Sequence, residues 1–248
     1  MATVLMLLPN RDFDPTEAGV PWETLTRLGH TVRFATPEGG VAQADARMVE
    51  GFGLGPWKVL LRADANGRRA HAAMTQDAAF LAPLRYAQAA QDGFDALLLP
   101  GGHAAGMREY LESEAVHAII ARAFARNQPV GAICHGVVAA ARARGADGRS
   151  VLHGRKTTAL TRTQELAAWL MTPWLGRYYR TYPETVQGEV TRALAARRDF
   201  QAGPPALLRD DPKHPERGFT VRDGRYLSAR WPGDVHRFAG EFAELLAA

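Results

Sequence analysis

The sequence predicts an α/β fold in which helices cover a mostly parallel sheet. Short apolar runs alternate with segments of helical periodicity, which is typical of strand–helix–strand units. Two of these runs end in turns rich in proline and glycine, at residues 37–40 and 100–102. Of the 248 residues, 46% are hydrophobic, which is enough to bury a large core. We therefore expect a single domain over residues 1–248.

The first half of the chain contains three expected strands and three expected helices. The first helix is the best marked, because Asp14 can cap it, Pro15 suits its first turn and Gly29 can end it. Residues 41–75 are irregular and rich in Gly, Ala and Asp, so we expect an excursion on the rim of the sheet. The expected strands are 3–8, 31–35 and 94–99, and the expected helices are 14–28, 77–90 and 114–126.

The second half of the chain begins with a buried strand that leads directly into Cys134. The pattern then changes, and residues 172–182 form an aromatic loop that contains Trp174 and three tyrosines. Near the end, Asp223-Gly224 is a typical hairpin turn. The expected elements are strand 130–133, helix 136–144, a short hairpin or strand at 150–160, helix 164–171, hairpin 219–229 and helix 234–246.

Composition argues against several classes of protein. No run approaches the roughly 18 apolar residues that span a membrane, and residues 1–8 lack the basic start of a signal peptide. The net charge is +4, but acidic residues lie among dispersed arginines, so we do not expect nucleic-acid binding. The single cysteine cannot form an internal disulfide, and without a thiol cluster we expect no metal site. A cytoplasmic protein is the simplest interpretation.

The segment Val130 to Gly136 is the most informative one. A buried strand leads into Cys134 and His135, and a helix follows at once, with small residues at 132 and 136. This order predicts a sharp elbow that lifts the thiol to the carboxyl edge of the sheet, where ligands bind in open α/β folds. The helix N-terminus would favour the thiolate, and His135 could act as its base.

A second turn follows the preceding buried strand. Here Pro100 is followed by Gly101, Gly102 and His103. Two glycines allow the backbone to approach a ligand closely and to present amides to a developing oxyanion. Such a turn is weak evidence alone, but the next strand in the sequence carries Cys134. We therefore expect Gly101, Gly102 and His103 to bind the substrate.

These motifs resemble those of the ThiJ/PfpI superfamily. Residues 97–103 are similar to the family's strand and oxyanion turn, and residues 132–136 are similar to its cysteine elbow. The resemblance covers residue 1 to about residue 170. It implies a flavodoxin-like three-layer sandwich with a mostly parallel central sheet, no cofactor and a homodimer.

The resemblance also implies two carboxylates in the site. Glu17 lies where the family places a glutamate that hydrogen-bonds the cysteine, although a capping-box glutamate would occupy the same position. In the heat-shock chaperone branch, an acid follows the cysteine beyond a strand that begins with glycine and a basic residue. The segment from Gly154 to Glu165 has that form, which nominates Glu165 to orient His135.

Class I glutamine amidotransferases offer a competing interpretation. They combine a cysteine elbow with a distant His-x-Glu motif, and this chain contains His214-Pro215-Glu216. In those enzymes the histidine ends a hydrophobic strand, whereas His214 lies in a polar segment broken by proline. We therefore do not assign these residues to the site.

Several activities use the same residues within the ThiJ/PfpI superfamily. The resemblance to its glyoxalase III and chaperone branch implies that Cys134 attacks small aldehydes such as methylglyoxal and yields hydroxy acids. Deglycase activity belongs to the same expectation. A PfpI-like peptidase or amidase, a stress chaperone and a thiol oxidation sensor remain as alternatives.

Overall fold

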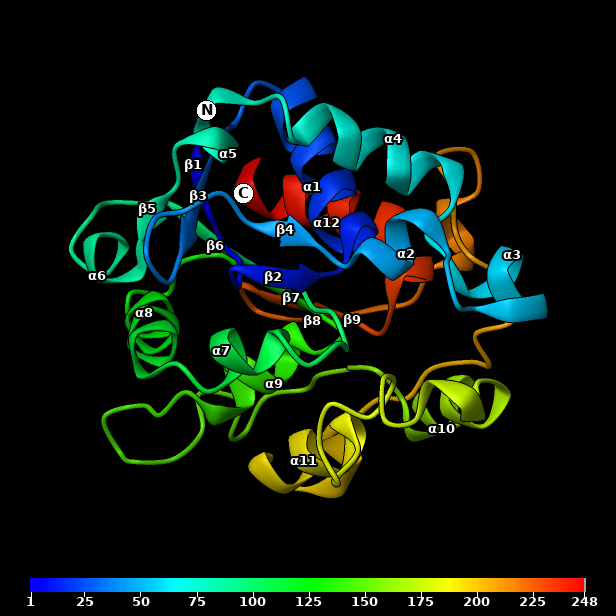
Figure 1. Cartoon of the computed structure of the whole chain (residues 1–248). Coiled ribbons are helices and arrows are strands. Elements are labelled where there is room, and N and C mark those ends of the chain that lie inside the picture. Colours follow the sequence, from blue (N-terminus) through cyan, green and yellow to red (C-terminus); the bar gives the residue numbers. More distant parts are fainter. Residues whose placement is uncertain (248) are drawn as a thin grey trace.

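The computed structural model describes residues 1–247 and has a seven-stranded sheet at its centre (Figure 1). Its strand order is β5-β3-β1-β6-β7-β9-β8, and every neighbouring pair is parallel except β8 with β9. The mostly parallel α/β fold is therefore confirmed. The strands are β1 (Thr3–Leu7), β3 (Thr31–Thr36), β5 (Leu84–Arg85), β6 (Ala96–Leu99), β7 (Val130–Ile133), β8 (Thr220–Asp223) and β9 (Tyr226–Ala229).

Helices cover both faces of this sheet (Figure 1). Helices α1, α4 and α12 lie on one face, and α7, α8 and α9 lie on the other. The central strands β6 and β7 are buried along their whole length, which explains why they appear in the sequence as continuous apolar runs. These helices are α1 (Pro15–Arg27), α4 (Ala65–Met74), α7 (Met107–Leu111), α8 (Glu114–Ala125), α9 (Gly136–Arg142) and α12 (Val235–Ala247).

The irregular excursion expected at residues 41–75 is largely helical, which corrects the prediction. Helix α4 packs on α1 at a close approach: a side chain at Gly19 would meet the backbone of His71, and one at Gly67 would meet Thr16. The small residues of this segment, which look typical of a loop in the sequence, thus allow the two helices to pack closely. The segment comprises β4 (Gln43–Ala44), α2 (Ala46–Glu50) and α3 (Lys58–Leu61) besides α4, and β4 pairs with the unpredicted strand β2 (Arg11–Phe13).

Two further predictions of regular structure were wrong. The helix expected at 77–90 is broken by Pro83, because the residue before a proline disfavours helical geometry. It gives α5 (Ala78–Leu81), the edge strand β5 and α6 (Tyr86–Ala89). The hairpin or strand expected at 150–160 contains only isolated bridges, one of which joins Thr157 to Phe200. There Thr157 bonds to the side chains of β9 and not to its backbone.

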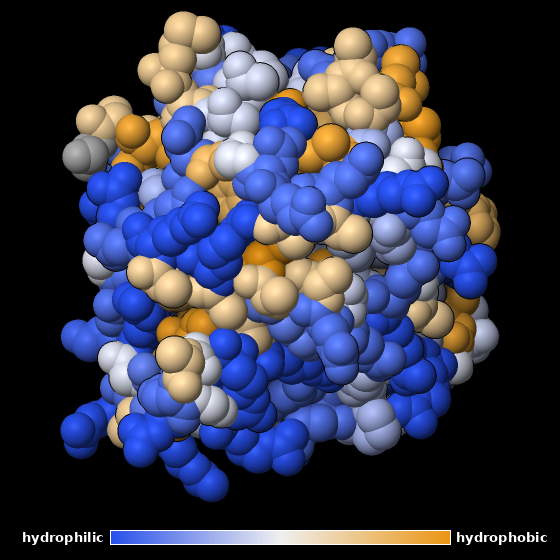
Figure 2. Space-filling view, turned by 90° about the vertical axis from the view of Figure 1, so that its left-hand side faces the viewer, coloured by the Kyte–Doolittle hydropathy of each residue, from blue (hydrophilic) through white to orange (hydrophobic). Residues whose placement is uncertain are grey.

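A third group of elements extends beyond the helical layer of α7, α8 and α9 (Figure 1). Helices α10 (Arg162–Met171) and α11 (Val186–Ala193) pack on each other, and α11 packs on α9. The aromatic loop 172–182 connects them and includes one short 3-10 turn, Pro173–Leu175. The left-hand side of Figure 1, which carries β5 and α6, faces the viewer in Figure 2, where hydrophilic residues predominate and hydrophobic ones are scattered among them. Along residues 1–247, no helix is long and apolar enough to cross a membrane.

A buried ion pair joins the end of β9 to the start of α12. The guanidinium of Arg230 donates two hydrogen bonds of 2.8 and 2.9 Å to Asp234, and both side chains are almost fully buried. Arg230 also donates to the carbonyls of Ala202 and Pro204. The pair therefore links Ala202 and Pro204 to the junction of β9 and α12.

We expect Asp234→Ala to lower the free energy of unfolding by about 3–5 kcal/mol, because it leaves Arg230 buried without its partner. Urea denaturation followed by circular dichroism measures this loss. The control is Glu23→Ala, which breaks the more exposed pair with Arg69 and should cost at most about 1 kcal/mol. Equal losses for the two variants would contradict this account.

Candidate active site

Cys134 lies on a strained elbow between β7 and α9. Its φ angle is 57°, in the left-handed region that residues other than glycine rarely adopt. The elbow packs tightly on the turn after β6, since a Cβ on Gly136 would lie 1.9 Å from the carbonyl oxygen of Leu99. The structure thus places Cys134 on the predicted elbow at the carboxyl edge of the sheet.

Glu17 points from the first turn of α1 toward the same elbow. Its Oε2 accepts a hydrogen bond of 2.7 Å from the amide of Gly101, and its buried Oε1 has no partner among residues 1–247. The capping of α1 falls to Asp14, whose Oδ1 accepts from the amides of Thr16 and Glu17. The carboxyl group of Glu17 is therefore not used in a capping box and remains available to Cys134.

Burial is the main cause of the shifted pKa values of Glu17 and Cys134. It raises the pKa of Glu17 well above its ordinary value, and the charge of Asp14 raises it further. Burial also raises the pKa of the Cys134 thiol, as do the carboxylates of Glu17 and Asp14, whereas the amide of His135 lowers it. The expectation that the helix N-terminus would favour the thiolate leaves out these larger effects. Burial therefore favours the protonated forms of both the Glu17 carboxyl group and the Cys134 thiol.

The two glycines of the turn after β6 have different roles. The amide of Gly101 is already bonded to Glu17, so it cannot serve an oxyanion as expected. The amide of Gly102 has no hydrogen-bond partner among residues 1–247, and the residue lines the cavity. Of the two predicted donors, only Gly102 is free to donate.

His135 lies beside the thiol, with its Nδ1 3.5 Å from the Sγ of Cys134. Its Nε2 is 3.0 Å from the Oγ1 of Thr181. Burial is the main cause that lowers the pKa of His135 to about 3, and the charges of His103 and Arg142 add to it. The imidazole is therefore neutral at pH 7 and can accept a proton only transiently.

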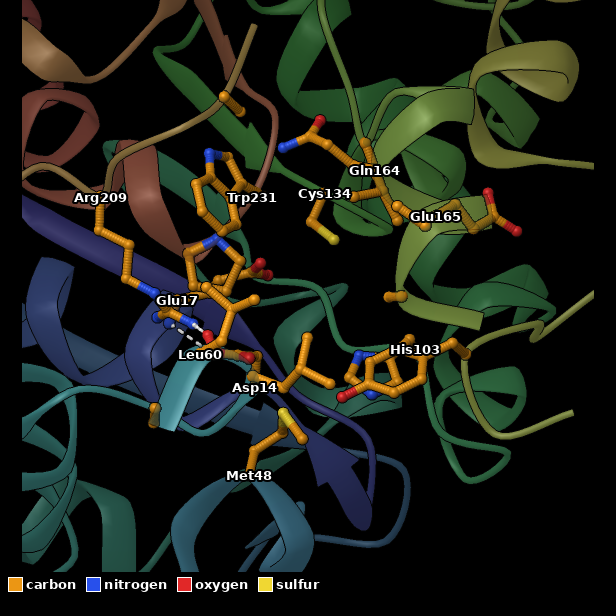
Figure 3. Close-up of a pocket in the computed structure, with 18 of the residues that line it drawn as sticks. Asp14, Glu17, Met48, Leu60, His103, Cys134, Gln164, Glu165, Arg209 and Trp231 are labelled. Carbon is orange, nitrogen blue, oxygen red and sulfur yellow. Dashed lines mark hydrogen bonds between the residues drawn. The ribbon is translucent and has the colours of Figure 1, made fainter. Parts of the chain in front are cut away.

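The structure does not bring Glu165 to His135. Its carboxyl group accepts a hydrogen bond of 2.9 Å from the amide of Val186 and forms an ion pair of 3.1 Å with Arg180. Figure 3 shows this carboxyl group turned away from Cys134. The partner position on His135 is occupied by Thr181 instead, so Glu165 does not take the orienting role expected for it.

His103 and the aromatic loop form one wall of the site. The His103 ring stacks on Tyr179 at 4.3 Å and meets Tyr178 edge-on at 4.7 Å. Tyr178 in turn donates a hydrogen bond to Asp45, which caps α2. Burial lowers the pKa of His103 to about 3, and its Nε2 has no partner in the described chain. A neutral, unpaired imidazole nitrogen thus lies in the cavity wall.

These groups surround a cavity of about 220 Å³ (Figure 3). Cys134, Glu17, Gly102 and His103 line it together with Arg209, which donates a hydrogen bond of 3.1 Å to the carbonyl of Leu60. The rest of the wall is mainly apolar. Glu165 also lines the cavity, and the larger apolar members of the wall are Met48, Leu60, Leu61, Leu160, Met171, Tyr179, Leu207 and Trp231.

Two other kinds of site can be compared with the structure. The His214-Pro215-Glu216 segment lies outside the cavity, where His214 is half exposed and bonds to Asp211. Among residues 1–247, no three His, Cys, Asp or Glu side chains come together as metal ligands.

Comparison with known proteins places the chain in a family. A family model described as ThiJ/PfpI family-like matches residues 8–204, and the chain therefore belongs to the ThiJ/PfpI family. An uncharacterised protein of Schizosaccharomyces pombe is 29% identical over 118 residues, which is 47% of this chain. That match covers only 43% of the yeast protein.

Solved structures share the fold at low identity. The Rapid Encystment Protein 24 kDa of Francisella tularensis has a TM-score of 0.70 at 17% identity, with 99% of each chain covered. Glyoxalase III of Candida albicans also has a TM-score of 0.70 at 17% identity, with 98% of this chain and 96% of that chain covered. At this identity the likeness concerns the three-dimensional fold.

The sequence did not point to two residues of the site. Thr181 lies in the aromatic loop between Arg180 and Tyr182, where no local sequence pattern marks a threonine as part of a site. Arg209 lies in a proline-rich segment without periodicity, which reaches the site through long-range contacts with Arg230, Leu60 and Trp231. Both depend on long-range contacts that no local pattern records.

We expect Glu165→Gln to lower the free energy of unfolding by about 3 kcal/mol, because it leaves Arg180 without its buried partner. The alkylation rate of Cys134 by iodoacetamide should change less than about twofold, since Glu165 does not touch His135. Urea denaturation and intact mass measure the two effects.

The control for this prediction is Glu184→Gln, which removes an exposed pair with Arg192 and should cost at most about 1 kcal/mol. A large loss of Cys134 reactivity in a stable Glu165→Gln protein would restore Glu165 to the reactive site.

Proposed function

We propose that the protein is a cysteine-dependent, glyoxalase III-like enzyme that converts small reactive aldehydes to hydroxy acids without a cofactor. The observation that carries this proposal is that Cys134 and Glu17 line one cavity, with the imidazole of the buried His135 next to the thiol. Membership of the ThiJ/PfpI family and the shared fold with a glyoxalase III support it.

The first step is the attack of the Cys134 sulfur on the aldehyde carbon of methylglyoxal. The thiol proton passes to Nδ1 of His135, and the new alkoxide takes up the proton of Glu17 to give a hemithioacetal, which leaves Glu17 as a carboxylate for the next step. The amide of Gly102 is the free donor that can stabilise the alkoxide. Burial of the thiol requires that proton removal and attack occur together, because a free thiolate is disfavoured before substrate binds.

The second step is an internal oxidation and reduction. Glu17 removes the proton from the former aldehyde carbon and returns a proton to the neighbouring carbonyl carbon through an enediol, which yields a lactoyl thioester. Its raised pKa suits both directions of this transfer, and Oε1 is free for it. Water then hydrolyses the thioester, so that lactate leaves and the thiol is restored. The aldehyde carbon is oxidised and the ketone carbon is reduced, so no external oxidant is needed.

We expect the purified protein to convert methylglyoxal to lactate without glutathione, as measured by enzymatic lactate assay. Cys134→Ala should abolish the reaction, and Glu17→Gln should reduce kcat by at least about 100-fold, because each removes a group that forms or breaks a bond. His214→Ala, outside the cavity, is the control and should retain wild-type activity. Absence of lactate from the wild-type protein would rule out this activity.

We also expect phenylglyoxal to have a KM about tenfold lower than methylglyoxal. The phenyl ring would bury roughly 60 Å² more apolar surface in the cavity, which is worth about 1.5 kcal/mol at about 25 cal/mol per Å². Met171→Asn should reduce this preference because Met171 lines the cavity, whereas Leu170→Asn should not, because Leu170 is 69% exposed and lies outside it. A lower KM for methylglyoxal would contradict the apolar site.

A further inference from the structure

A chain of two hydrogen bonds leads from the oxyanion turn to His135. The Oγ1 of Thr181 lies 2.6 Å from the carbonyl oxygen of His103 and 3.0 Å from the Nε2 of His135. Thr181 and His135 are both buried, with 4% and 1% of their surface exposed. The polar atoms of these two hydrogen bonds are therefore shielded from water and depend on each other for hydrogen bonding.

The direction of both bonds follows from the chemistry of the groups. A carbonyl oxygen can only accept, so Thr181 must donate its single hydroxyl proton to the backbone carbonyl of His103. The hydroxyl can then only accept from His135, which requires a proton on Nε2 of the imidazole. A neutral ring carries one proton, so Nδ1 holds a lone pair, and this is the nitrogen that lies 3.5 Å from the Cys134 sulfur.

We propose that Thr181 is a positioning residue that holds His135 in the tautomer able to accept the thiol proton. The inference rests on the proposed role of Cys134 as nucleophile. In the other tautomer, Nδ1 would carry the proton and could take none from the thiol, while Nε2 and the Thr181 hydroxyl would lack a shared hydrogen. Thr181 thus performs the task that the resemblance to the heat-shock chaperone branch implied for Glu165.

Thr181 is itself held in place by a cation. Arg108 of α7 donates two hydrogen bonds, of 3.1 and 2.6 Å, to the carbonyl oxygen of Thr181. The guanidinium also lies over the ring of Tyr182, 5.0 Å from its centre. These contacts anchor the end of the aromatic loop, so the hydroxyl of Thr181 stays between His103 and His135.

A hydroxyl partner differs from a carboxylate partner in charge. A carboxylate would stabilise the imidazolium form, whereas Thr181 orients the ring without a compensating charge. The low pKa of His135 agrees with this arrangement. His135 then passes the thiol proton onward within the reaction, and no lasting thiolate–imidazolium pair forms in the resting protein.

The tautomer can be measured without any substrate. Long-range ¹H–¹⁵N spectra of protein labelled at its 8 histidines distinguish a protonated from an unprotonated ring nitrogen, and a His135→Gln sample assigns the His135 signals. We expect the wild type and Thr181→Ser to be protonated at Nε2 alone. Thr181→Val, which keeps the shape but not the hydroxyl, should show a mixture of both tautomers. A wild-type ring protonated at Nδ1 would overturn the inference.

Reactivity supplies the second readout. Cys134 is the only cysteine, so alkylation by iodoacetamide followed by intact mass reports on it alone. We expect Thr181→Val to lower kcat by about 100-fold with KM within about twofold, and to slow alkylation, because it weakens the general base. Thr181→Ser should restore both rates to within about threefold of wild type.

The outcomes separate this inference from the proposed function. If the wild type forms no lactate but its tautomer and alkylation rate depend on the Thr181 hydroxyl, the positioning role stands and the aldehyde activity fails. If lactate forms and Thr181→Val changes neither tautomer nor kcat, the positioning role fails alone. If Thr181→Val does not fold, the wild-type tautomer and the Thr181→Ser rates still test whether Thr181 positions His135.

Discussion

The close approach of two backbone turns determines the geometry of the site. The elbow after β7 lies against the turn after β6, and the contact is so tight that neither Gly101 nor Gly136 could carry a side chain in place. Cys134 adopts a φ angle of 57° on this elbow, at a cost of roughly 1–2 kcal/mol. Packing against the neighbouring turn has to offset that cost, because an isolated chain would relax it. The strained backbone of Cys134 is thus one of the features that hold the thiol at the elbow.

Gly101 also docks the first helix onto the sheet. The amide of Asp14 donates to the Gly101 carbonyl at 2.9 Å, and the Gly101 amide donates to Glu17 at 2.7 Å. Two hydrogen bonds therefore tie the start of α1 to the turn that contacts the elbow. Because Asp14 already caps the helix, Glu17 can be buried beside the thiol without leaving the first turn of α1 unsatisfied. The carboxylate that caps α1 and the carboxyl group beside the thiol thus lie one turn of helix apart.

The sequence predicts the parts of this molecule that depend on local patterns. Strands β1, β3, β6 and β7, helices α1, α8 and α12 and the hairpin β8–β9 follow from apolar periodicity, caps and turn residues, and they lie within one or two residues of the predicted bounds. Elements that depend on tertiary contact were missed. Helix α4 forms because Gly67 lets it approach α1, and the pattern of small residues there looks like a loop. In the site, the adjacent Cys134 and His135 could be recognised, but Thr181 could not, because 46 residues separate it from His135.

The position of Glu165 in the structure shows why sequence spacing alone cannot assign the partner of a histidine. In a cavity with mainly apolar walls, a carboxylate beside His135 would need compensating donors to be buried at acceptable cost. Arg180 and the amide of Val186 are the donors that this chain provides, and they hold Glu165 away from the ring. A threonine needs only one acceptor, which the carbonyl of His103 supplies. The hydroxyl therefore orients the base without bringing a further negative charge to a site where Glu17 and Asp14 already oppose ionisation of the thiol.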